Sequence, residues 1–131
     1  MTFRPFTVAA LPAVEGVDTV VLDTTIDPGM SGVVTAVLFQ WTGSGLEYAS
    51  GDLIWRVRIG RWFAKGLENV DLPLGNLARY FEYGGRERLY SKQRVRVYAY
   101  LGSGALSRLS PDGRIISSLD GHIWPDAAWR A

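Results

Sequence analysis

Residues 53–59 carry an apolar side chain at every second position. The apolar positions are Leu53, Trp55, Val57 and Ile59, and Arg56 and Arg58 lie between them. Successive side chains of a β-strand point to opposite faces, so this period of two predicts a strand with one face in the core and one face in water. Residues 94–101 repeat the pattern, with arginines and tyrosines opposite the apolar positions.

Other segments also have the composition of strands and are separated by turn sequences such as Asp27-Pro28-Gly29. The predicted strands cover residues 17–26, 32–41, 52–63, 89–101 and 114–124, and residues 77–83 form either a short strand or one helical turn. Residues 32–41 have apolar side chains on both faces, which favours a central position. No segment has a sustained apolar period of 3.6. The chain is therefore predicted to be an all-β sandwich or barrel of the Greek-key or jelly-roll kind.

The first 14 residues are predicted to form an extended arm, and residues 15–131 a single domain. Apolar residues of the arm are interrupted by Pro5 and Pro12, unlike the unbroken apolar core of a secretion signal. Two arrangements are open: the arm packs over its own sandwich, or it reaches a neighbouring subunit and adds a strand to an open edge. The prolines limit such pairing to a few residues.

Charge is distributed unevenly although the net charge is only +1. Residues 1–55 contain one basic and six acidic side chains, and residues 56–131 contain thirteen basic and seven acidic ones. Either the two halves interleave in the sheets and cancel, or the surface is polarised toward a partner. We expect the first arrangement, with outward arginines paired to carboxylates across strands. The weak net charge also argues against nucleic acid as a partner, although arginines beside Tyr98 and Tyr100 are the best case for it.

No group of residues has the pattern of a catalytic or metal site. The chain has no cysteine and one histidine, His122, which leaves only a lone general base. The spacing of Asp18, Asp23 and Asp27 matches no calcium loop. We therefore expect no enzymatic activity, no cofactor and no metal. No apolar stretch approaches the roughly 18 residues that would span a membrane, so no membrane partner is expected.

Tryptophans offer a possible sugar-binding platform, because flat aromatic faces stack on pyranose rings. Trp55 aligns with the core face of its strand, and Trp41 is expected to share a face with Val33, Val37 and Phe39. Trp62 and Trp129 remain as exposed candidates.

The strand pattern resembles that of a known group of viral proteins. The segments that carry the resemblance are Asp27-Pro28-Gly29, Ile54-Trp55-Arg56-Val57-Arg58-Ile59-Gly60, Leu72-Pro73-Leu74-Gly75, Gln93-Arg94-Val95-Arg96-Val97-Tyr98 and Gly121-His122-Ile123-Trp124-Pro125. Together they are similar to the small jelly-roll virion proteins of tailed bacteriophages, and in size to capsid cement or decoration proteins. The resemblance implies an antiparallel two-sheet jelly roll.

This resemblance also implies a mechanical function. A cement protein is made in the host cytoplasm, binds the major capsid protein on the capsid exterior, and forms a dimer or trimer. Similar jelly rolls serve as carbohydrate-binding, tail, neck or fibre modules, which is the alternative. Aromatic, arginine and large apolar side chains of the arm and of residues 79–83 are the expected partner interface, with Trp129 added. The predicted interface residues are Phe3, Arg4, Phe6, Val8, Leu11, Arg79, Tyr80, Phe81, Tyr83 and Trp129.

Overall fold

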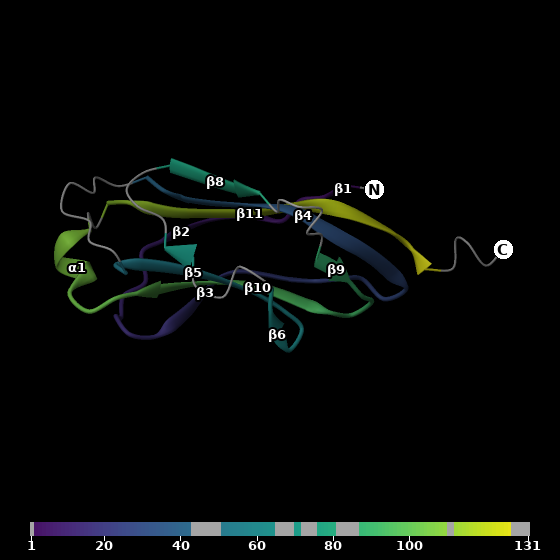
Figure 1. Ribbon diagram of the computed structural model, residues 1–131, viewed down its shortest axis with the longest axis horizontal. Coiled ribbons are helices and arrows are strands. Elements are labelled where there is room, and N and C mark those ends of the chain that lie inside the picture. The colour runs from purple at the N-terminus through teal and green to yellow at the C-terminus, as the bar shows by residue number, and fades with distance from the viewer. Residues whose placement is uncertain are drawn as a thin grey trace.

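The computed structural model describes residues 2–42, 51–64, 70–71, 76–80, 87–109 and 112–126, and for residues 76–80 and 87 the backbone alone. The described strands form two antiparallel sheets that lie one on the other (Figure 1). The first sheet contains β1 (Thr2–Phe3), β2 (Phe6–Ala10), β4 (Met30–Trp41), β8 (Asn76–Tyr80), β9 (Glu87–Leu89) and β11 (Arg114–Pro125). The second sheet contains β3 (Asp18–Thr25), β5 (Leu53–Ile59), β6 (Trp62–Phe63), β7 (Val70–Asp71) and β10 (Arg94–Leu101). The all-β sandwich predicted from the sequence is confirmed.

Consecutive long strands alternate between the two sheets. In the first sheet β11 and β4 are central, β1 and β2 pair with β11 at one edge, and β8 and β9 pair with β4 at the other. In the second sheet β10 and β5 are central, β3 lies at one edge, and β6 and β7 lie at the other. The central position expected for residues 32–41 is confirmed by β4.

The core lies between the sheets and contains the apolar faces that the sequence predicted. Trp55 of β5 is 1% exposed and stacks on Phe39 of β4, with ring centroids 4.8 Å apart and planes 14° apart. Val57 of β5 and Val97 of β10 are opposite each other and fully buried. Full burial of one such side chain contributes about 1.5–3 kcal/mol, so these faces hold the sheets together.

Two predicted strands are shorter than expected because the chain reverses within them. The strand predicted over residues 52–63 ends at Ile59, and Gly60 (φ 63°) begins a hairpin in which Trp62 pairs with Ile59. Residues 89–101 divide at Lys92, which has φ 64°. β9 and β10 belong to different sheets, so the chain crosses between the layers at this point.

β-Bulges in β4 and β3 change which side chains of these strands face the core. Thr35 is the extra residue opposite the Asp120–Gly121 step, so Val34 faces the core and Val33, opposite exposed His122, does not. The expectation that Trp41 shares a face with Val33 is therefore wrong. In β3 the register shift lies at Val21.

The bulge in β3 buries both Val21 and Leu22, because one extra residue changes the face of every residue beyond it. Asp23, opposite Arg96, consequently lies on the exposed outer face.

The N-terminal segment lies on its own sandwich. β1 and β2 pair with β11, from Thr2 opposite His122 to Ala10 opposite Arg114. Pro5 falls between the two strands, where its carbonyl accepts the Leu119 amide at 3.1 Å. Proline is tolerated at such an edge because the missing donor breaks no central ladder. β2 ends at Ala10, two residues before Pro12.

Candidate interaction surfaces

The arm residues predicted as interface have different surroundings. Phe3 is buried in the core, and Leu11 packs against the core cluster. Arg4 is exposed and donates from Nε to Oδ1 of Asp120 at 2.7 Å. Phe6 and Val8 are 58% and 55% exposed. Both side chains are exposed because residues 6 and 8 of a β-strand lie on the same face, and this face of β2 points to water.

Phe6 and Val8 lie on the outer face of the first sheet, at the edge formed by β2. Phe6 is opposite Ser118, which is opposite Leu38, and Val8 is opposite Ile116. Residues opposite each other in antiparallel strands share a face. Phe6, Val8, Leu38 and Ile116 therefore lie on the same outer face of β2, β11 and β4, with Ser118 between Phe6 and Leu38, and we call this surface the apolar face.

Residues 79 and 80 lie at the opposite edge of the same sheet. The backbone of β8 pairs with β4, with Arg79 opposite Val37 and Tyr80 opposite Ala36. Of the two alternatives for this segment, the strand is therefore correct. Both predicted interface segments belong to one sheet, which their separation in sequence did not show. Phe81, Tyr83 and Trp129 lie outside the described residues.

The outer face of the second sheet is rich in arginine and tyrosine. Arg96 is opposite Arg58, Tyr98 is opposite Arg56, and Tyr100 is opposite Ile54. Arg94 adds a fourth guanidinium, opposite Thr25. We call the surface formed by Arg56, Arg58, Arg94, Arg96, Tyr98 and Tyr100 the arginine face.

Carboxylates of β3 neutralise two of these arginines. Arg94 donates to Asp23 from Nε at 2.9 Å and from Nη2 at 2.5 Å, and these bonds are the main reason that the pKa of Asp23 is lowered. Arg56 forms an ion pair with Asp18, and its guanidinium lies 4.9 Å from the ring centre of Tyr100. Acids from the first half of the chain thus pair with arginines from the second half, as we expected.

Arg58 and Arg96 differ from their neighbours. They are directly opposite each other on β5 and β10, and both are half-buried. The Nε of each is buried and has no acceptor among the described residues, and neither forms an ion pair in that part of the chain. The guanidinium of Arg96 lies 5.8 Å from the ring centre of Tyr98. The centre of the arginine face therefore carries two adjacent positive charges.

The hairpin between β5 and β6 projects from the second sheet (Figure 1). At its tip Trp62 is 78% exposed and Phe63, opposite Arg58, is 42% exposed. The exposure expected for Trp62 is confirmed.

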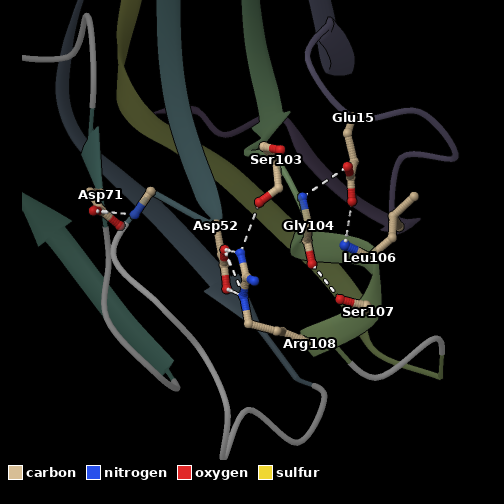
Figure 2. Close-up of polar contacts among 9 residues, drawn as sticks. Glu15, Asp52, Asp71, Ser103, Gly104, Leu106, Ser107 and Arg108 are labelled. Atoms are coloured by element: carbon tan, nitrogen blue, oxygen red, sulfur yellow. Dashed lines mark hydrogen bonds and ion pairs between the residues drawn. The ribbon is translucent and has the colours of Figure 1, made fainter.

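A polar network closes the end of the sandwich next to α1 (Ala105–Arg108), as Figure 2 shows. The Glu15 carboxylate accepts hydrogen bonds from the backbone amides of Leu106 at 2.8 Å and Gly104 at 2.9 Å. These two bonds lower the pKa of Glu15. Asp52 is 1% exposed. Its carboxylate accepts hydrogen bonds from Nη2 of Arg108 at 2.6 Å and from Nε of Arg108 at 2.9 Å.

Sequence reasoning did not identify this network. Its one local signal is the turn sequence before α1. Asp71 completes it by accepting the Gly51 amide at 2.8 Å. Every carboxylate in it has a donor, so its evident role is to hold the loops at this end.

Titratable groups do not converge elsewhere in the described ranges. His122 is exposed on β11. Those ranges contain no cluster of three His, Cys, Asp or Glu side chains with metal-binding geometry. The helix among them has four residues, far short of a membrane span. No family model matches the chain, and no curated protein matches its sequence.

Proposed function

We propose that this chain is a non-enzymatic structural protein of a virion, with a jelly-roll fold, that binds and stabilises the exterior of a bacteriophage capsid. The observation that carries the proposal is the apolar face. Phe6 and Val8 are more than half exposed on the outer face that they share with Leu38 and Ile116. Large apolar side chains that gather on one face of a sheet favour a protein-binding surface.

The strand order supports the jelly-roll part of the proposal. Long strands alternate between the sheets along the chain, from β2 through β3, β4 and β5 to β8, β10 and β11. A jelly roll places its strands in two facing sheets through paired Greek keys. The first sheet has the order β2-β11-β4-β8 and the second β3-β10-β5-β6.

The partner in this proposal is the major capsid protein. The apolar face would cover neighbouring capsid subunits, and Arg4 with its partner Asp120 would lie at the rim. Apolar centres with polar rims are the usual arrangement of such interfaces. A dimer or trimer of this chain would increase binding strength by engaging several capsid sites at once.

Binding to capsids tests the proposal. We expect Phe6→Ser/Val8→Ser to lose co-sedimentation with particles assembled from the major capsid protein of the same bacteriophage. Val14→Ser/Val17→Ser is the matched control, because these valines are 58% and 53% exposed but lie outside the first sheet. Undiminished binding by the first variant would contradict the proposal. Point variants are preferable to deleting residues 1–14, since that deletion also removes Phe3 from the core.

Trp62 favours a second candidate, a carbohydrate-binding module of a tail or fibre. Its side chain is 78% exposed on a projecting hairpin, beside Phe63. On a glycan array, sugar binding that is lost in Trp62→Ala and kept in Phe6→Ser/Val8→Ser would replace the first proposal by this one.

A further inference from the structure

In the part of the chain that the structure describes, no carboxylate forms an ion pair with the two arginines at the centre of the arginine face. Arg58 and Arg96 are opposite each other in a position where like charges repel across strands. On this face, Asp23 is opposite Arg96 but bonds Arg94 through both of its oxygens. The Asp23 carboxylate therefore attracts Arg96 through its charge but forms no hydrogen bond with it.

The other described carboxylates on this face also have donors. Asp18 pairs with Arg56, and Asp71, which is opposite Ile54, accepts the Gly51 amide. The flanks of the face thus show how arginines on these strands bind carboxylates. The central pair lacks such a ligand among the described residues.

We propose that Arg58 and Arg96 bind carboxylates from an acidic segment of a partner protein. Guanidinium groups bind carboxylates through two parallel hydrogen bonds, and these charge-assisted bonds are stronger than neutral ones. Two adjacent guanidiniums would donate hydrogen bonds to neighbouring Asp or Glu side chains of an extended segment. This surface lies on the second sheet, whereas the apolar face lies on the first, so the inference is independent of the proposed capsid contact.

The surroundings of the pair favour protein over nucleic acid. Base stacking requires free aromatic faces, but guanidiniums already lie over Tyr98 and Tyr100. The chain has a net charge of +1, a weak attraction for a polyanionic backbone. Phe63 and Val20 border the arginines with exposed apolar surface. Arginine and tyrosine beside apolar anchors are typical of protein interfaces.

The site is tested by titrating the protein with a short poly-L-glutamate peptide. The Nε–Hε NMR signals of the arginines report which side chains bind it. We expect Arg58 and Arg96 to shift most. Arg58→Gln/Arg96→Gln should weaken binding by roughly tenfold or more, since it removes two charge-assisted contacts. Arg88→Gln/Arg114→Gln removes the same charge from the first sheet and should change the dissociation constant by less than about twofold, since distant exposed charges are screened.

Reversing one charge of the pair gives a second test, because the melting temperature of the variant is measured without any peptide. Arg58→Glu places a carboxylate opposite Arg96 and should raise the melting temperature while abolishing peptide binding. Equal weakening by both double variants, absence of peptide binding, or tighter binding of oligothymidylate of equal charge would overturn the proposal. A lower melting temperature for Arg58→Glu would show that the arginine pair is already compensated, and would also overturn it.

Discussion

The Oγ1 atom of Thr7 donates a hydrogen bond to the carbonyl oxygen of Val21 at 2.7 Å. Thr7 belongs to the first sheet and Val21 to the second, so this bond joins the edges of the two layers. The same hydroxyl lies 3.0 Å from the Ser117 hydroxyl of β11. β2 is therefore held by side-chain bonds as well as by its ladder, which fixes Phe6 and Val8 on the surface.

Replacing Thr7 by valine should loosen this edge. Thr7→Val keeps the side-chain shape but removes both bonds, and one net hydrogen bond contributes about 0.5–1.5 kcal/mol. We expect amide exchange over residues 6–10 to accelerate by roughly tenfold, the factor that about 1.4 kcal/mol produces. Hydrogen-exchange mass spectrometry measures this. Thr2→Val, at an exposed site of the neighbouring strand, is the control, and equal acceleration in both variants would contradict the role of Thr7.

The buried carboxylate of Asp52 should make Arg108 important for stability. Arg108→Gln removes the bidentate partner of that carboxylate, and the loss of such hydrogen bonds by a buried acceptor costs about 1–3 kcal/mol. Urea unfolding should show this loss. Arg108→Gln/Asp52→Asn should recover part of it, because the uncompensated charge is gone. A double variant that is less stable than Arg108→Gln would contradict this explanation.

The sequence predicts the faces of β5 and β10 correctly because both strands pair through their full length without a bulge between them. There the period of two, read from Trp55 or Val97, determines burial directly. Around Thr35 and Val21 the same reading fails. A bulge depends on the pairing of a strand with its neighbour, and this neighbour lies far away in the sequence.

The candidate surfaces were predicted in part for the same reason. The sequence predicts Phe6 and Val8 as interface residues of the arm. The face that they share with Leu38 could not be predicted, because it depends on the order of strands in the sheet. The charge difference between the halves predicts arginine–aspartate pairing. It does not show that Asp23 bonds Arg94 rather than Arg96, because that choice depends on side-chain geometry across two strands.

Gly121 should tolerate no side chain. A Cβ at this position would overlap the carbonyl oxygen of Val33 on the adjacent strand and crowd Val34. Gly121→Ala therefore forces the β4–β11 ladder apart, and overpacking of this kind costs about 1–3 kcal/mol. Thermal unfolding of Gly121→Ala against His122→Ala, which changes an exposed neighbour on the same strand, measures the effect. Comparable stability of the two variants would show that the ladder adjusts without cost.

Glu15 should make the α1 end of the sandwich sensitive to acid. The amides of Leu106 and Gly104 stabilise its carboxylate and hold its pKa below the ordinary value. A lowered pKa in the folded state stabilises the fold above the ordinary carboxyl pKa, and this contribution disappears as the pH falls through the folded-state pKa. Glu15→Gln keeps the shape but not the charge. We expect its melting temperature to lie below that of the unaltered chain at pH 7 and to converge with it toward pH 3, whereas a difference that stays constant over this range would show that the charge of Glu15 is not what holds α1.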